Sequence, residues 1–116
     1  MSKKTWIIVR TSFRAIHQWK NAPVEVEFLL AIHRHTFYVE AKIPVTHNDR
    51  QLEFFMVQMF LDKAIKKRFP NEKIGQMSCE MIAADLLDDI SAEYGIKRDL
   101  SVMVSEDNEN AGIVEI

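Results

Sequence analysis

The first part of the chain alternates apolar and polar residues with the two-residue period of a β-strand. The segment from Trp6 to Trp19 is rich in β-branched and aromatic residues and predicts one strand. Residues 21–23 should turn the chain. The segment from Val24 to Ile43 then alternates apolar residues with glutamate and lysine, which predicts one long or bent second strand. We expect the two segments to pair as an antiparallel hairpin.

Beyond Pro44 the hydrophobic period lengthens to about 3.5 residues, which indicates an amphipathic helix. We expect this helix to end near Phe69, because Pro70 cannot continue it. Its apolar stripe consists of Leu52, Phe55, Met56, Met59, Phe60 and Ala64.

A second helix is predicted after the loop at residues 71–77. Ser78 is its expected N-cap and Gly95 the residue that closes it. Its inner face should consist of Ile82, Leu86 and Ile90. Residues 98–106 and 111–116 then predict two more strands. The order β-β-α-α-β-β is an α+β pattern with an antiparallel hairpin at each end.

Composition and charge limit the class of protein. The chain has 116 residues, 47% apolar and 28% charged, which predicts one folded domain over residues 1–116. The net charge of −2 gives no overall field that would attract nucleic acid. The single cysteine excludes an internal disulfide framework. Since no signal-like or membrane-spanning apolar stretch is present, we expect a cytoplasmic protein with no membrane partner.

Candidate chemistry centres on three of the four histidines. His33 and His35 are two residues apart in the second predicted strand, so their side chains should share one face and could share a metal ion. A hairpin turn centred near Ala22, however, sets His17 opposite Glu27 or the next residue, well away from the pair. Bringing the three imidazoles together requires a bulge, a bend or a longer connection.

Three neutral imidazoles with one open position are typical of catalytic zinc. The alternative is three unrelated polar residues on a sheet. A further metal pattern, the cupin spacing H-x-H-x4-E, is matched by His33, His35 and Glu40. In a regular strand Glu40 falls on the face opposite the histidines, and the glycines that flank the cupin motif are absent.

Five segments carry a resemblance to a known family: SFRAIHQW, HRHTF, LEFFMVQMFLDKAI, SCEMIAADLLDDI and VMVSEDNENAGI. Their order and approximate spacing resemble the 6-pyruvoyl tetrahydropterin synthase and 6-carboxytetrahydropterin synthase family over nearly the whole chain. The resemblance implies the tunnelling fold, an antiparallel sheet with two helices on one face. It also implies a homo-oligomer, trimer or hexamer, in which the subunits join their sheets into a barrel.

The same resemblance implies roles for particular residues. His17, His33 and His35 would bind zinc. Glu106 matches the glutamate that holds the pterin ring, where a carboxylate can accept two hydrogen bonds from a ring N–H and the neighbouring amino group. The turn that lines the pterin pocket in the family is matched by Ser78 and Cys79.

The sequence departs from the family at its proton-transfer groups. The positions usual for the catalytic cysteine hold Leu29 and Glu27, of which only Glu27 could act as a base. The family's aspartate–histidine pair between the helices is absent, because residues 66–80 contain neither residue type. Arg34 replaces the glycine between the paired histidines, on the face away from the zinc ligands.

Three functional hypotheses follow. The first is a divergent zinc-dependent pterin synthase of the carbon–oxygen lyase type, acting on dihydroneopterin triphosphate or a related dihydropterin, with Glu27 as the replacement catalytic base. The second is a non-catalytic protein that keeps the zinc site and binds a pterin or purine-like ligand. The third is an oligomer in which zinc is structural, which leaves Glu106 unexplained. The missing groups make ligand binding a firmer expectation than turnover.

Overall fold

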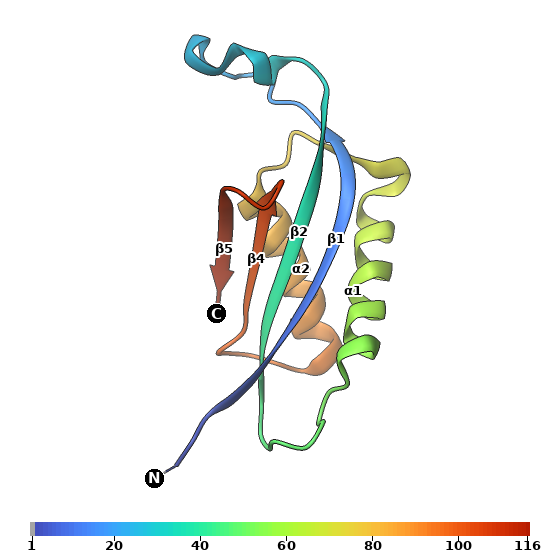
Figure 1. Cartoon of the computed structure of the whole chain (residues 1–116), viewed down its shortest axis with the longest axis vertical. Helices are drawn as coiled ribbons and strands as arrows, with labels where there is room; N and C mark the ends of the chain where they lie inside the picture. Colours follow the sequence, from blue (N-terminus) through green and yellow to red (C-terminus); the bar gives the residue numbers. More distant parts are fainter. Residues whose placement is uncertain (1) are drawn as a thin grey trace.

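The structure is a computed structural model and describes residues 2–116. Its elements are β1 (Thr5–His17), η1 (Val24–Leu30), β2 (His33–Val45), α1 (Phe54–Arg68), η2 (Pro70–Glu72), β3 (Lys73–Gly75), α2 (Cys79–Tyr94), β4 (Ser101–Glu106) and β5 (Ala111–Glu115). Figure 1 shows β1 and β2 as long bent strands, with η1 projecting beyond one end of the sheet. The five strands form one sheet in the order β3-β1-β2-β4-β5.

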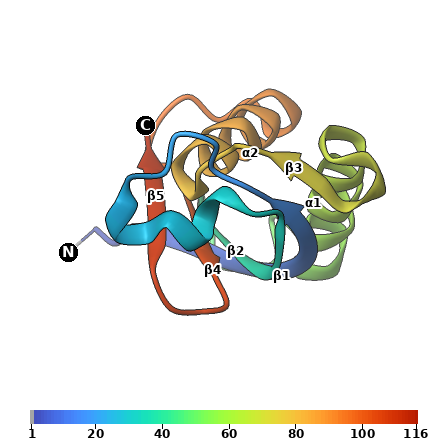
Figure 2. The same ribbon diagram turned by 90° about the horizontal axis from the view of Figure 1, so that it is seen from above.

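Both α-helices cover the same face of this sheet, α1 over β1 and α2 over β4 and β5 (Figure 2). The core lies between the two layers, and its largest fully buried side chains include Phe37, Ile43, Leu61, Ile82, Leu86, Ile90 and Leu100. Among residues 2–116, neither α-helix has both the length and the apolar character that a membrane crossing requires. The expected two-layer α+β architecture is confirmed.

The second helix follows its sequence signals closely. The Ser78 hydroxyl accepts a hydrogen bond from the Met81 amide, as an N-cap does. Gly95 ends the helix with φ of 65°, the left-handed conformation that glycine adopts at low cost. The three expected inner residues, Ile82, Leu86 and Ile90, are fully buried.

The first helix buries a different face from the one its stripe suggested. Val57, Leu61 and Ile65 are its buried residues, whereas Phe55 and Met56 are 71% and 68% exposed. Of the remaining members of the stripe, Met59 is also exposed, and Leu52, Phe60 and Ala64 are partly buried. Apolar residues occur almost all the way round the first turns of α1, so their period alone does not identify the side that packs on the sheet.

The prediction of one strand from Val24 to Ile43 is wrong in its first part. Val24–Leu30 is a kinked 3₁₀ segment with no buried residue, and β2 begins only at His33. Alternation of apolar and polar residues favours a strand only where a partner strand and a core are available. The segment η1 projects beyond the end of the sheet and has neither. The loop predicted at residues 71–77 also contains the short strand β3, which pairs parallel to β1, so the sheet is mixed and not purely antiparallel.

The connection between β1 and β2 is longer than the turn expected at residues 21–23, and this changes the register of the first hairpin. Thr5 pairs with Val45 at one end of the ladder, and His17 pairs with His33 at the other. The expected pairing of His17 with Glu27 is therefore wrong, because residues 18–32 loop out between the strands in place of a tight turn.

Candidate functional site

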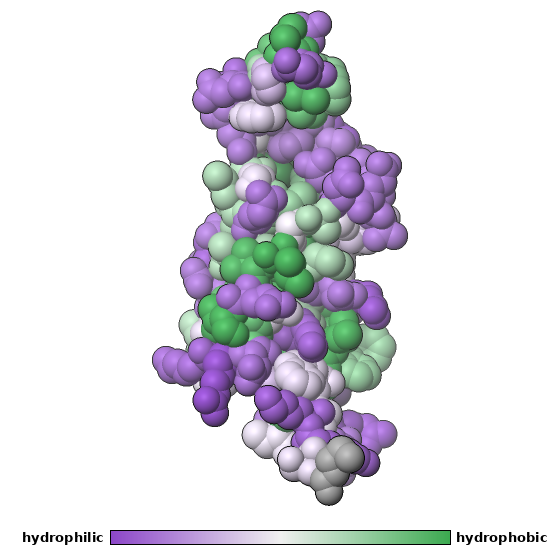
Figure 3. All heavy atoms as spheres, turned by 90° about the vertical axis from the view of Figure 1, so that its left-hand side faces the viewer, coloured by the Kyte–Doolittle hydropathy of each residue, from purple (hydrophilic) through white to green (hydrophobic). Residues whose placement is uncertain are grey.

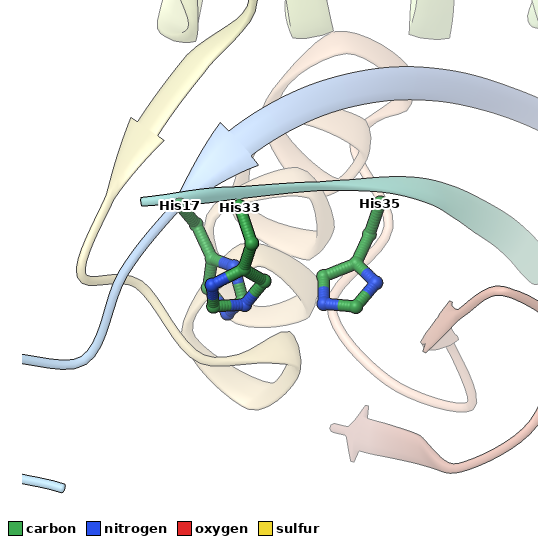
Figure 4. Close-up of side chains that lie close together, drawn as sticks. All are labelled: His17, His33 and His35. Atoms are coloured by element: carbon green, nitrogen blue, oxygen red, sulfur yellow. The ribbon is translucent and has the colours of Figure 1, made fainter. Parts of the chain in front are cut away.

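The histidines belong to the face of the sheet that carries the core. Successive side chains of a strand point to opposite faces, so Ala15 and His17 of β1 lie on one face, as do His33, His35 and Phe37 of β2. Ala15 and Phe37 are fully buried, and the histidines continue the same inward-facing rows to the end of the sheet. Figure 4 shows the three rings projecting to one side of the paired strands.

The register brings the three rings into contact range. The ring centroids of His17 and His33 are 4.3 Å apart, those of His33 and His35 are 4.7 Å apart, and those of His17 and His35 are 5.3 Å apart. One nitrogen from each ring lies within 4.8 Å of the other two. The three histidines could therefore hold a metal ion between them.

Each of the three rings has one buried nitrogen without a hydrogen-bond partner among residues 2–116. His33 Nδ1 lies 2.8 Å from the Ala31 carbonyl oxygen, and His35 Nδ1 lies 2.5 Å from Asp107 Oδ2. The atoms without a partner are His17 Nδ1, His33 Nε2 and His35 Nε2, judged over the described part of the chain. Since an unpaired buried polar atom is costly, one such atom from each neighbouring imidazole fits a site for a bound cation.

The surroundings of His17 favour its neutral form, which is the form that binds a metal ion. Burial lowers the pKa of His17, the nearby His33 lowers it further, Glu106 acts in the opposite direction, and His35 adds to the lowering. A neutral ring keeps a lone pair for coordination.

Two carboxylates at the end of β4 adjoin the histidines. Glu106 Oε1 is 3.4 Å from His17 Nε2, and Glu106 Oε2 is 3.9 Å from His35 Nε2. The next residue, Asp107, has its pKa lowered by hydrogen bonds from the Thr36 backbone amide and from His35. Glu106 was a candidate from the sequence, whereas Asp107 was not, although Asp-Asn at residues 107–108 is a turn signal.

A cavity of about 540 Å³ opens beside the cluster. Its walls are formed by His17, Gln18, Trp19, Leu29, Gln76, Met77, Ser78, Cys79, Glu80, Met81, Glu106, Asn110 and Ala111. This volume suits a small-molecule ligand, and the mixture of apolar walls with a few polar groups is usual for such sites. The structure thus brings Glu106, Ser78 and Cys79 to one cavity with His17.

Cys79 is a thiol in this setting. Burial raises its pKa to about 11, and the charges of Glu106 and Glu80 act in the same direction. Glu80 is a second carboxylate in the cavity wall. The sequence did not mark it as a site residue, because an acidic residue in the first turn of a helix is common for reasons of helix stability alone.

Several other candidates lie away from the cluster. Glu27 is an exposed residue of η1 and is not among the residues that line the cavity, whereas Leu29 is. Arg34 pairs with Glu72 at 2.7 Å. Glu40 pairs with Arg10 at 2.8 Å, on the opposite face of the sheet from the histidines, so it does not complete a cupin ligand set.

The fold and the site together define a class: an α+β protein of the tunnelling fold with a three-histidine cluster beside a ligand-sized cavity. Solved structures that share the fold include 6-pyruvoyl tetrahydropterin synthase from Caenorhabditis elegans, with a TM-score of 0.63 and 12% sequence identity over 97% of this chain and 96% of that chain. An uncharacterized protein from Wolinella succinogenes matches with a TM-score of 0.69 and 13% identity over 98% of this chain and 99% of that chain. The expected fold is confirmed, and at this identity the likeness speaks for the fold alone.

Comparison by sequence adds no relative. No protein-family profile matches the chain, and no curated protein matches it either.

Proposed function

We propose that this protein binds zinc and a pterin and acts as a divergent pterin synthase on dihydroneopterin triphosphate or a related dihydropterin. The observation that carries the proposal is the cluster of three imidazoles, each with a buried nitrogen that has no partner among residues 2–116, beside a cavity that also contains Glu106. A metal cluster alone would not require the cavity, and a cavity alone would not require the three histidines.

The proposed metal ligands are His17, His33 and His35. Neutral imidazoles suit zinc, and three protein ligands leave a coordination position for a substrate. When bound, the ion supplies Lewis-acid polarisation of substrate oxygens. The chain's own contribution is to hold two of the rings by their Nδ1 atoms, through the Ala31 carbonyl and the Asp107 carboxylate.

The proposed pterin contacts are Glu106 and further residues of the cavity wall. The Glu106 carboxylate accepts hydrogen bonds from a ring N–H and the adjacent amino group. Because Glu106 lies within 4 Å of two of the histidines, a ligand that it holds would lie next to the cluster. Trp19, Leu29 and Met77 offer apolar surface to a planar ring, and Ser78 and Cys79 close the wall at the start of α2.

The proposed catalytic base is Glu27. It is a carboxylate in the segment that joins the two histidine-bearing strands, but it is not among the residues that line the cavity. Its role therefore requires η1 to close over the bound substrate. Loss of a general base lowers the rate by about 10²- to 10⁴-fold, so Glu27→Gln should reduce turnover on that scale and leave zinc content unchanged.

A second candidate is a non-catalytic protein that binds a pterin or purine-like ligand at the same site. The observation in its favour is Leu29, an apolar residue of the cavity wall at one of the positions where the family usually has its cysteine. Leucine cannot transfer a proton.

We also propose that the chain forms a cytosolic homo-oligomer, trimer or hexamer. The strands β3 and β5 are the edges of the sheet and can pair with another chain. Many large apolar side chains are also exposed, including Val24, Phe28, Ile32, Phe54, Phe55, Met56, Met59 and Ile113. Figure 3 shows apolar groups on the face that carries β5 and a further group at the η1 end.

The test combines metal content, ligand binding and turnover. We expect about one zinc per chain in the protein purified without added metal, and loss of that zinc in His33→Ala. The matched control is His47→Ala, because His47 is exposed and lies outside the cluster. Dihydroneopterin triphosphate is then added and products are separated by chromatography.

The outcomes separate the candidates. Zinc and a new product, both lost in His33→Ala, support the synthase. Ligand binding that depends on Glu106 without any product supports the non-catalytic protein. Equal zinc contents in His33→Ala and the wild type, or no zinc in either, contradict the three-histidine site.

A further inference from the structure

Asp107 occupies a fixed position in the turn between β4 and β5. The Glu109 amide donates a hydrogen bond to the Glu106 carbonyl oxygen at 2.9 Å, which closes a four-residue turn. The two central residues, Asp107 and Asn108, have φ of 51° and 60°. Positive φ at both positions is typical of a type I′ hairpin turn, and aspartate and asparagine tolerate it better than most residues.

The turn is also hydrogen-bonded to β2. The Asp107 amide donates to the Thr36 carbonyl oxygen at 2.7 Å, and the Thr36 amide donates to Asp107 Oδ1 at 3.0 Å. One carboxylate oxygen is thereby held by a backbone N–H. The other oxygen, Oδ2, is directed at His35 Nδ1, 2.5 Å away.

This contact determines which nitrogen of His35 carries the proton. A carboxylate only accepts hydrogen bonds, so the ring must donate from Nδ1. The neutral ring then has its lone pair on Nε2, which is the buried atom without a partner. A His35 ring with the opposite tautomer would present an N–H to the cluster and could not bind a cation there.

We propose that Asp107 is a positioning residue that fixes His35 in the tautomer with the proton on Nδ1 and so prepares Nε2 to bind metal. The part of this inference that concerns metal binding rests on the proposed function, whereas the tautomer itself is a property of the metal-free protein. His33 receives the same orientation from the Ala31 carbonyl oxygen, a backbone group that no substitution of Ala31 would remove. For His35 the same role falls to the Asp107 side chain, which a substitution can change.

The sharpest variant is Asp107→Asn. Asparagine keeps the shape of the side chain, tolerates positive φ, and retains an oxygen to accept from the Thr36 amide. Its NH₂ group then faces His35 Nδ1, which must become an acceptor, and the proton moves to Nε2. In a serine protease the equivalent aspartate-to-asparagine change leaves the geometry intact and inverts the tautomer. We expect the same inversion here.

The first measurement is the tautomer of His35 in the metal-free protein, read from long-range ¹H–¹⁵N NMR correlations of the ring nitrogens. The wild type should show the proton on Nδ1 and Asp107→Asn should show it on Nε2. The second is zinc affinity by competition with a chromophoric chelator, where we expect Kd to rise about 10- to 100-fold. Glu109→Gln is the matched control, because it removes one negative charge from the same turn and leaves the Asp107–His35 contact intact.

A second variant, Asp107→Gly, keeps the inference testable if asparagine disturbs the turn, since glycine adopts positive φ readily. It should give a mixture of His35 tautomers and an intermediate loss of zinc affinity. An unchanged tautomer in both variants overturns the inference, as does a zinc Kd that stays within about threefold of the wild type. If the wild type itself binds no zinc, the proposed function fails, while the NMR result still decides the role of Asp107.

Discussion

His17 and His33 face each other at the last rung of the β1–β2 ladder, with their ring centroids 4.3 Å apart. His35 lies one inward-facing position farther along β2, opposite Ala15. Alanine leaves room beside the rings where a larger side chain would separate them. The cluster is therefore produced by the register of a single hairpin.

The histidines should make the stability of the protein depend on metal. Zinc at about 100 times its Kd should stabilise the folded chain by about 2.7 kcal/mol, which raises Tm on the order of 10 °C for a chain of this size. In His33→Ala the rise should disappear, whereas the metal-free proteins should melt at similar temperatures because the wild type buries unpaired imidazole nitrogens. Differential scanning calorimetry with and without zinc tests this, and an equal rise in both proteins would contradict it.

Cys79 should be unreactive at neutral pH although it lines a cavity. With its pKa raised to about 11, the thiol carries almost no thiolate at pH 8. Alkylation by iodoacetamide at pH 8 should be about 100-fold slower than for a free cysteine. Because the Glu106 charge helps to raise this pKa, Glu106→Gln should speed the reaction. A fast reaction in the wild type, or no acceleration in the variant, would be inconsistent with this environment.

The raised pKa of Cys79 should also make the stability of the folded chain fall as the pH rises. Between the ordinary pKa of 9.0 and about 11, the unfolded chain loses a proton that the folded chain retains. The contribution to stability is therefore complete below pH 9 and is lost as pH rises toward 11. Urea unfolding between pH 8 and pH 10 should show a smaller decline in Cys79→Ala than in the wild type.

Gly112 should be needed for the close approach of β5 to α2. A Cβ atom at this position would lie 2.7 Å from Glu80 Oε1 and 2.9 Å from the Glu80 backbone nitrogen. Gly112→Ala must therefore displace the start of α2, and we expect a loss of about 1–3 kcal/mol in the free energy of unfolding together with weaker ligand binding. Glu115→Gln, at an exposed position of the same strand outside the cavity wall, is the control and should leave both quantities unchanged.

Arg68 should stabilise the packing of α1 against α2. Its guanidinium makes two hydrogen bonds to Asp89, at 2.7 and 2.8 Å, and lies 3.4 Å from Asp85. Arg68→Met should cost about 1 kcal/mol in urea unfolding, less at high salt because the groups are partly exposed. Lys67→Met is the matched control, since Lys67 has no ion pair among residues 2–116, and an equal cost in both variants would argue against a specific role of the Arg68 pair.

The exposed apolar start of α1 offers a test of self-association. Phe55 is 71% exposed and its neighbours Phe54, Met56 and Met59 are exposed as well, and grouped exposed apolar side chains mark interaction surfaces. Phe55→Glu should weaken the proposed oligomer by placing charge on this surface, and light scattering after size exclusion measures the mass directly. Lys63→Glu is the control, because Lys63 is an exposed residue of the same helix and the substitution shows whether added negative charge elsewhere on α1 has the same effect. An oligomer of unchanged mass in Phe55→Glu would remove this surface from the interface.

Local patterns determined a large part of the fold. The N-cap at Ser78, the left-handed Gly95 and the spacing of Ile82, Leu86 and Ile90 specify α2 by themselves, because each acts within one helix. Residues two apart in a strand share a face whatever the register, which is why His33 and His35 could be paired in advance. The same patterns predicted the α+β order.

The rest depended on contacts between distant residues. Alternation in Val24–Leu30 indicated a strand, but no sheet reaches that segment, and its 3₁₀ conformation moves the hairpin register so that His17 meets His33. Likewise, the surface that α1 buries was decided by the side that met β1, since several of its faces are apolar. Asp107 reaches His35 across 72 positions of the chain, and no local pattern encodes that contact. The sequence by itself placed His33 and His35 on one face of a strand, while the tertiary structure brought His17 to them, because register and packing depend on interactions between segments that are far apart in the chain.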